Sequence, residues 1–150
     1  MKTLYTDASF DWTSTKKTEE NVVRGKIAIA GEGFERIEKV VVGKVEGLKQ
    51  YINIFELIAV ARAVELASEE KPKEESLVVY TDSTTAKVWA SKGAVNPKSA
   101  TEAHDNAIEY LRKSRIQFGG IITFNFIPRD DNPAGKLLEA ELEKESPHSI

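Results

Sequence analysis

The chain has 150 residues, a length that one domain accommodates, and its formal net charge of −3 argues against gripping nucleic acid by bulk attraction, while leaving room for a local basic patch. Cysteine is absent, which excludes disulfides and thiolate ligands, and the only histidines are His104 and His148, so a bound metal would be a hard cation held by oxygen. No apolar run reaches the roughly 18 residues of a membrane span, and the first residues do not read as a signal peptide. We therefore expect one soluble, cytoplasmic domain over residues 1–150.

The N-terminal third is predicted to form an antiparallel meander of three strands. The first strand carries Asp7 and is followed by a charged loop over residues 10–24. Residues 25–30 alternate as a strand, glycines supply a turn, and residues 36–45 form a valine-rich third strand.

A long helix is predicted from Ile54 to about Glu70, with Asn53 as its N-terminal cap. At about 100° per residue, Glu56 lies roughly opposite Glu65 on this helix, and the residues three and four positions after Glu56 are uncharged. We therefore expect Glu56 to face the packed side, where a carboxylate must be paired, protonated or bound to a cation. The alternative is a first-turn glutamate that interacts with the helix dipole.

The stretch from Leu77 to Ser83 is typical of a buried strand that ends on a carboxylate, Asp82. The Asp, Ser and Thr residues that follow are typical of a helix N-terminus, and a short helix is predicted over residues 84–91. The residues before Asp82, Tyr80 and Thr81, repeat the residues Tyr5 and Thr6 that precede Asp7. If the two strands pair in parallel, both carboxylates lie side by side at the sheet edge where α/β proteins bind ligands.

The remaining elements complete an α/β pattern. Residues 69–76 and 91–98 read as connectors, residues 101–115 as a helix with one buried stripe, residues 121–127 as a final strand and residues 133–145 as a last helix. Residues 146–150 read as a loose end. The order predicts a mixed sheet, with the meander on one side and parallel additions on the other.

Three local phrases, taken in order, resemble ribonuclease H of type 1. Tyr5-Thr6-Asp7-Ala8-Ser9 is similar to the family's T-D-G-S, Asn53-Ile-Phe-Glu56-Leu-Ile-Ala59 to its N-x-x-E-L-x-A, and Thr81-Asp82-Ser83 to its T-D-S. Each phrase is weak by itself, and the ordered set is specific. The resemblance implies a ribonuclease H-like fold, with a five-stranded mixed sheet flanked by helices.

The closing segment also resembles the family but departs from it at one position. Residues 127–138 are similar to P-R-x-x-N-x-x-A-D-x-L-A, and alignment on Asn132 places Lys136 where the family has its fourth acidic residue. The candidates to replace that acid are Asp130, Asp131 and Glu139. Two further departures are the charged loop in place of the family's glycine-rich turn and the lack of a basic helical protrusion.

The resemblance implies hydrolysis of the RNA strand of RNA/DNA hybrids by two Mg²⁺ ions, with Mn²⁺ as a possible substitute. Asp7, Glu56 and Asp82 would hold the metal, and Asp131 or Glu139 would complete the catalytic set. Contacts to the nucleic acid are implied for a further group: Ser9, Asn53, Ser83, Arg129 and Asn132. No membrane partner is expected, and the chain is taken as a monomer.

Two alternatives remain open from the sequence. One is a catalytically weak or inactive ribonuclease H-like module that binds hybrids or single strands and has lost the fourth ligand. The other is a nuclease or recombinase of the same superfold that acts on DNA. Carboxylates at strand ends and in a first helical turn are also common capping residues, so each acid taken alone has an ordinary structural explanation.

Overall fold

The computed structural model describes residues 2–16, 20–72, 74–96, 98 and 100–145. Five strands form one mixed sheet in the order β3-β2-β1-β4-β5. They are β1 (Lys2–Phe10), β2 (Val22–Gly31), β3 (Phe34–Gly43), β4 (Ser76–Thr81) and β5 (Ile121–Phe126). β1 pairs antiparallel with β2 and parallel with β4, so it joins the meander to the parallel half. The predicted mixed α/β sheet is confirmed.

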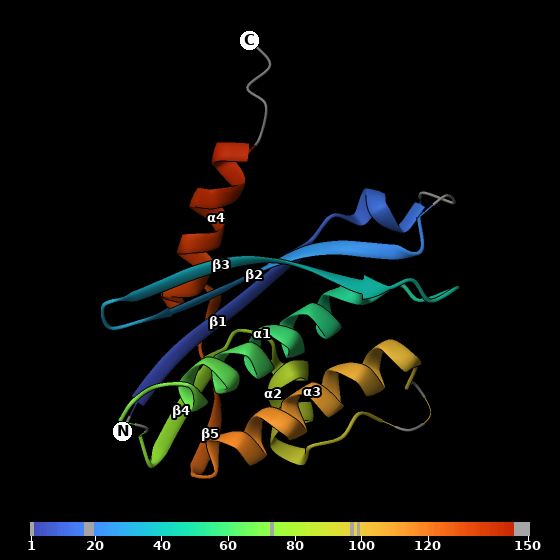
Figure 1. Cartoon of the computed structure of the whole chain (residues 1–150). Coiled ribbons are helices and arrows are strands. Elements are labelled where there is room, and N and C mark those ends of the chain that lie inside the picture. Colours follow the sequence, from blue (N-terminus) through green and yellow to red (C-terminus); the bar gives the residue numbers. More distant parts are fainter. Residues whose placement is uncertain (1, 17–19, 73, 97, 99, 146–150) are drawn as a thin grey trace.

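Helices cover the two faces of the sheet unequally (Figure 1). α1 (Tyr51–Ser68), α2 (Thr84–Lys92) and α3 (Glu102–Phe118) lie on one face, and α4 (Pro133–Glu145) lies on the other. Since side chains alternate along a strand, β1 sends Leu4 and Ala8 into the large core beneath α1. Tyr5 packs instead in the small cluster under α4. Asp7, an odd-numbered residue of β1, therefore lies on the α4 face.

The core beneath the sheet is built around α1. Most of this helix is buried, and its largest buried side chains include Tyr51 and Phe55. The cluster under α4 is much smaller and consists of small side chains with one leucine: Ala28, Ala30, Ala134 and Leu138. α1 therefore anchors one face of the sheet strongly, while α4 covers only part of the other.

Two element boundaries differ from those predicted. α1 begins at Tyr51, and its N-cap is Gln50 without a side-chain cap, so Asn53 lies inside the helix and the prediction of Asn53 as the cap was wrong. The predicted loop over residues 10–24 contains a 3₁₀ helix, η1 (Trp12–Lys16), and the start of β2. Part of this segment, residues 17–19, lies outside the described residues, as does the predicted loose end at 146–150.

A second 3₁₀ helix, η2 (Arg129–Asp131), connects β5 to α4. In the described part of the chain, no helix combines the length and apolar character needed to cross a membrane.

Candidate functional site

Asp7 and Asp82 meet because β1 and β4 run in parallel. In this register Thr6 lies opposite Thr81, so the next residue on each strand is an aspartate. Glu56 reaches the same point from α1, on the opposite side of the sheet. One carboxylate oxygen from each residue lies within 4.8 Å of the other two, which brings together three acids distant in sequence.

Glu56 is buried, with 4% of its surface exposed. Its Oε1 accepts a hydrogen bond of 3.1 Å from the backbone N–H of Ala8, which holds the side chain against β1. Its Oε2 is buried and finds no hydrogen-bond partner among the described residues. Because α1 begins at Tyr51, Glu56 lies beyond the first turn, and the alternative in which it serves the helix dipole is wrong.

The three carboxyl groups of this cluster lie close enough to shift one another's pKa values. Burial raises the pKa of Glu56 well above its usual range, and the neighbouring charges of Asp7 and Asp82 raise it further. Burial also raises the pKa of Asp7, while its hydrogen bond with Glu56 lowers it. An unpartnered buried oxygen within a set of three carboxylates fits a hard divalent cation, which takes oxygen ligands and offsets the desolvation of the acids.

Asn132 ties the end of η2 to the acid cluster. It is fully buried, its Nδ2 donates to the carbonyl of Thr6 at 3.0 Å and to Asp82 Oδ2 at 3.4 Å, and its Oδ1 accepts from the N–H of Ala134. The side chain of Asn132 is enclosed and its amide is engaged within the protein, and its predicted contact with nucleic acid stays a prediction. Its role in the structure is to position Asp82 and the first turn of α4.

The first turn of α4 lies directly against the acids. A Cβ atom added to Gly135 would stand 3.2 Å from Asp7 Oδ2, closer than most real contacts of such an atom. Lys136, the next residue, is exposed. The first turn therefore brings a glycine to Asp7 and a lysine to the position where the resemblance calls for an acid.

The structure does not bring a fourth acid into the cluster. Among the described residues, the group close enough to share an ion consists of Asp7, Glu56 and Asp82 alone. Asp130 and Asp131 are exposed on η2, and Glu139 is exposed on α4 with an oxygen 4.0 Å from Arg129 Nη2. The assignment of Asp131 or Glu139 as a catalytic acid stays a prediction.

The other residues predicted to contact nucleic acid differ in exposure and in their hydrogen-bond partners. Ser9 follows Asp7 by two positions on the same face of β1, and Arg129 has an exposed side chain. Asn53 is partly buried and donates to Gln50. The hydroxyl of Ser83 accepts from the N–H of Ala86 at 3.0 Å and caps α2, so its known partner is structural.

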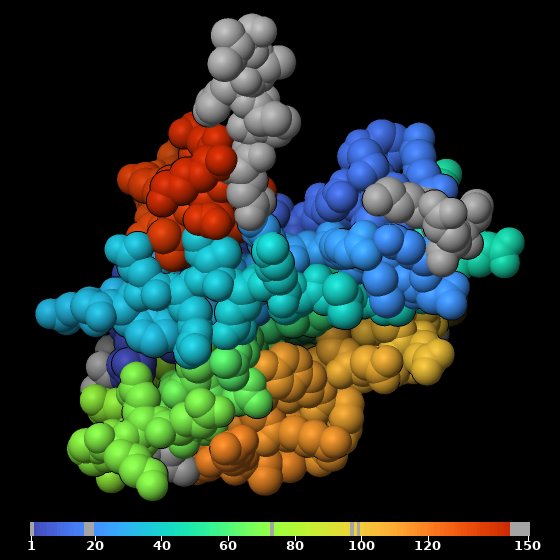
Figure 2. All heavy atoms as spheres, turned by 45° about the horizontal axis from the view of Figure 1, so that its top comes forward, coloured from blue at the N-terminus to red at the C-terminus, as the bar shows by residue number. Residues whose placement is uncertain are grey.

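Beside the cluster, the uncovered half of the sheet forms a groove of about 530 Å³. Figure 2 shows this hollow between α4 and the segment that leads from β1 into η1. Its floor carries one cross-strand row, Ser9 opposite Lys26 and Lys26 opposite Lys39, on the same face as Asp7. The motifs singled out in the sequence do not include these lysines, although their position on strands with alternating burial was a usable signal.

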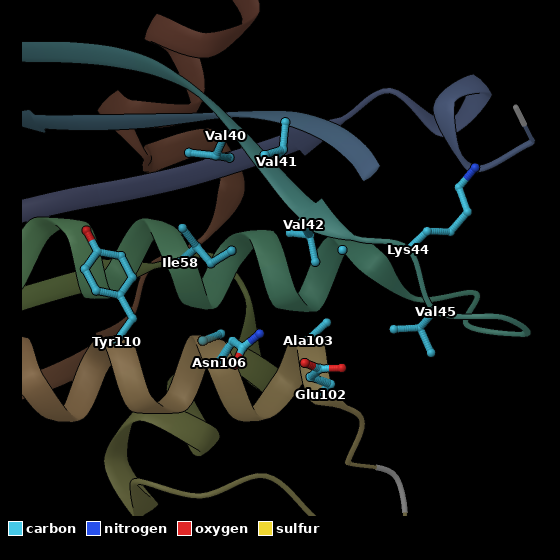
Figure 3. Close-up of a pocket in the computed structure, with 12 residues that line it drawn as sticks. Val40, Val41, Val42, Lys44, Val45, Ile58, Glu102, Ala103, Asn106 and Tyr110 are labelled. Atoms are coloured by element: carbon cyan, nitrogen blue, oxygen red, sulfur yellow. The ribbon is translucent and has the colours of Figure 1, made fainter. Parts of the chain in front are cut away.

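A second cavity, of about 480 Å³, lies on the other face between β3, α1 and α3 (Figure 3). Val42, Ile58 and Tyr110 contribute apolar lining from these three elements. None of the three clustered acids lines it. Three carboxylates that could hold a cation gather at the acid cluster and not in this cavity, so we place the candidate site at the acids.

Several solved structures have a fold similar to that of this chain. No protein-family model and no curated protein sequence matches the chain. A ribonuclease H1 from Halobacterium salinarum NRC-1 is 14% identical, with a TM-score of 0.59, over 95% of this chain and 98% of that one. LC11 ribonuclease H1, solved in complex with an RNA/DNA hybrid, is 18% identical with a TM-score of 0.60, over 97% and 100%. The N-terminal ribonuclease H domain of a Mycobacterium tuberculosis protein is 13% identical, with a TM-score of 0.55, over 97% and 100%.

Proposed function

We propose that this chain, which has the ribonuclease H-like fold, is a metal-dependent endonuclease that hydrolyses the RNA strand of RNA/DNA hybrids. The observation that carries the proposal is the convergence of Asp7, Glu56 and Asp82, with an unpartnered buried oxygen on Glu56. Both the fold and this geometry favour hydrolysis of a phosphodiester over a purely structural role for the acids.

The chain's own residues supply a fixed set of oxygen ligands. Asp7 hydrogen-bonds with Glu56 of α1, and its strand β1 pairs in parallel with β4, which leads directly into Asp82. Asp7 is therefore the acid that links the other two. Asp7, Glu56 and Asp82 would hold Mg²⁺ there, and the metal would supply activation of a water and stabilisation of the leaving oxygen. Because β1, β4 and α1 are held in the packed sheet, these ligands need little rearrangement to bind it.

Selection of the RNA strand requires contacts to the 2′-hydroxyl. Ser9 and Asn53 are the residues that we propose for this contact, since each lies close in sequence to one of the clustered acids. Arg129 is the residue that we propose for a phosphate contact, because its side chain is exposed and its charge acts on Asp7.

The test uses a labelled RNA/DNA hybrid with Mg²⁺, and separately with Mn²⁺. We expect the wild-type chain to cut the RNA strand, and Asp82→Asn to lower the rate at least about 100-fold while the fold is retained, because removal of a charged metal ligand weakens the centre. Asp105→Asn, which removes an exposed aspartate of α3 outside the cluster, is the matched control and should cut at the wild-type rate. Equal cutting by the Asp82 and Asp105 variants would contradict the assignment.

A binding module without catalysis is the second candidate, favoured by the lysine at position 136. The same assay separates the two, because such a module would retain the hybrid in an anisotropy measurement and leave it uncut in either metal. Cutting of duplex DNA but not of the hybrid would point instead to a DNA nuclease of the same fold.

A further inference from the structure

The first turn of α4 places a lysine beside the acid cluster. Gly135 stands against Asp7 Oδ2, and the backbone N–H of Lys136 donates to the carbonyl of Asn132, the residue that also contacts Asp82. The backbone at Lys136 is therefore fixed next to the metal-binding aspartates, and its exposed side chain starts from that point. A lysine stem is flexible and ends in a compact charge that binds phosphate well.

Charge balance at this site differs from that of a site with four acids. Three ionised carboxylates carry three negative charges, and the positive charge of Arg129 acts on Asp7, which leaves about two negative charges for one divalent cation to neutralise. A second cation would lie roughly 3.5 to 4 Å from the first. Because the repulsion between two divalent ions is four times that between two unit charges at the same separation, a second ion needs further negative charge close by.

The described part of the chain does not supply that charge from another acid. Asp130 and Asp131 are exposed on η2 and are not members of the cluster. Glu139 is exposed, and the charged group recorded near it is Arg129, at 4.0 Å. The segment next to Asp7 instead carries two cationic residues: Arg129, whose charge acts on Asp7, and Lys136, which follows Gly135 on α4.

We propose that this site binds one divalent cation tightly and that Lys136 brings to the reacting phosphate the positive charge that a second ion would otherwise supply. This inference rests on the proposed function and differs from the two-ion chemistry that the resemblance implies. It assigns Lys136 a direct contact with the phosphate and makes the lysine a functional substitution for the missing acid.

The test is the stoichiometry of Mn²⁺ binding to the whole chain, measured by isothermal titration calorimetry without nucleic acid. We expect one tight equivalent in the wild-type chain and a second at least about 10-fold weaker. Lys136→Asp adds a carboxylate and removes a cation, so its second equivalent should tighten at least about 10-fold, because divalent-ion affinity depends on the number of charged ligands. Lys113→Asp, which makes the same change on the exposed surface of α3, should titrate like the wild-type chain.

Lys136→Gln tests the phosphate contact separately, since it removes the charge without adding a ligand. Its metal stoichiometry should stay at one tight equivalent, while hybrid cleavage at saturating metal should fall about 100-fold, the usual loss for one donor to a developing charge. Because Lys136 is exposed, the variant should fold, and thermal unfolding verifies this.

Three outcomes overturn the inference: two equivalents of similar affinity in the wild-type chain, a titration of Lys136→Asp that matches Lys113→Asp, or full cleavage by Lys136→Gln. If the wild-type chain cuts the hybrid and binds two equal ions, the proposed function stands and only this inference fails. If the wild-type chain neither binds metal nor cuts the hybrid, the proposed function itself fails.

Discussion

At the scale of single residues, Glu56 has the strongest link between energetics and chemistry. It is one of the few buried charged groups among the described residues, and its environment raises its pKa chiefly through burial. A raised pKa means that the folded state binds the proton more tightly than the unfolded state. In the absence of metal, the stability tied to this group is therefore fully present below the unfolded pKa near 4.5 and is lost as pH rises through the folded pKa.

Replacing Glu56 by glutamine should therefore stabilise the metal-free chain at neutral pH. We expect a gain of roughly 1 kcal/mol or more, since an uncompensated buried charge is among the larger single-residue effects. Urea unfolding with a chelator, at pH 5 and pH 7.5, should show a smaller loss of stability on going to pH 7.5 than in the wild-type chain. Glu46→Gln, an exposed change, is the control, and a wild-type pH dependence in Glu56→Gln would contradict the explanation.

His104 has a structural role at the start of α3. It is buried on α3, and its Nδ1 accepts a hydrogen bond from the backbone N–H of Thr101. The hydroxyl of Thr101 accepts in turn from the backbone N–H of His104. Burial lowers the pKa of His104. The neutral ring, with the proton on Nε2, is therefore the form that completes this capping box.

The pH dependence that follows has the opposite sign to that of Glu56. The pKa of His104 is lower in the folded state than in the unfolded state. The stability that this residue contributes is therefore present above the unfolded pKa of about 6.5 and is lost as pH falls through the folded pKa. We expect a loss of about 1 kcal/mol or less, the usual value of a cap. Thermal unfolding across this range should show the loss in the wild-type chain, and a His104→Gln variant that keeps the same slope would contradict it.

At the scale of elements, local patterns predicted most of the fold because they report burial directly. The valine-rich and alternating strands, the strand before Asp82 and the buried stripe of α3 all follow from periodicity. The pairing of Asp7 with Asp82 followed from the repeated phrase around them. Element order and this part of the site were therefore predictable from residues near one another in the chain.

The predictions that failed depend on contacts between distant residues. α1 starts at Tyr51 because the tyrosine ring is buried and its hydroxyl bonds both the N–H and the carbonyl of Val45, which no capping rule detects. Val22 is extended within the predicted loop because it pairs with Gly43. Asn132 is a different case: its contact with nucleic acid stays a prediction, and only its enclosure between β1 and α4 could not be predicted from the sequence.

The uncovered strands next to α4 offer a test of substrate contact at this scale. Lys26 and Lys39 lie directly opposite on neighbouring strands and both line the groove, a pair of positive charges that suits a phosphate backbone. We expect Lys39→Gln to weaken hybrid binding and to reduce the slope of log affinity against log salt by about 0.9, the value for one lost phosphate contact. Fluorescence anisotropy in a chelator measures both quantities.

Lys113→Gln on α3 is the matched control for this change, because it also removes one exposed positive charge. An identical salt slope for wild-type, Lys39→Gln and Lys113→Gln would show that the groove does not contact the backbone. The net charge of −3 makes the comparison informative, since general attraction to nucleic acid is weak in this chain.

At the scale of the whole molecule, we propose that residues 1–150 form one domain that works as a monomer. The sheet runs from the meander through β1 to β4 and β5 without a break, and α1 packs against strands of both halves. Far-UV circular dichroism and tyrosine or tryptophan fluorescence should therefore follow one coincident urea transition. Two separated transitions would contradict a single domain.

Addition of Mg²⁺ should shift that transition to higher urea, because the ion binds the folded acid cluster and not the unfolded chain. At a concentration 100 times the dissociation constant, the gain is about 2.7 kcal/mol. The shift should be absent in Asp82→Asn and present in Asp105→Asn, which ties the effect to the cluster rather than to general screening of the acidic surface.

The thin attachment of α4 has a consequence for local opening. This helix packs through Ala134 and Leu138 on Ala28 and Ala30 of the sheet, with the amide of Asn132 at its start, whereas α1 is buried along most of its length. The other side chains packed in this cluster are only partly buried: Tyr5, Ile37 and Leu137. Backbone amides of α4 should thus exchange with deuterium through fluctuations that leave the sheet intact, well before those of α1. Each such excursion would carry Gly135 and Lys136 away from Asp7, so the helix that completes the site is also the part of the molecule most easily withdrawn from it.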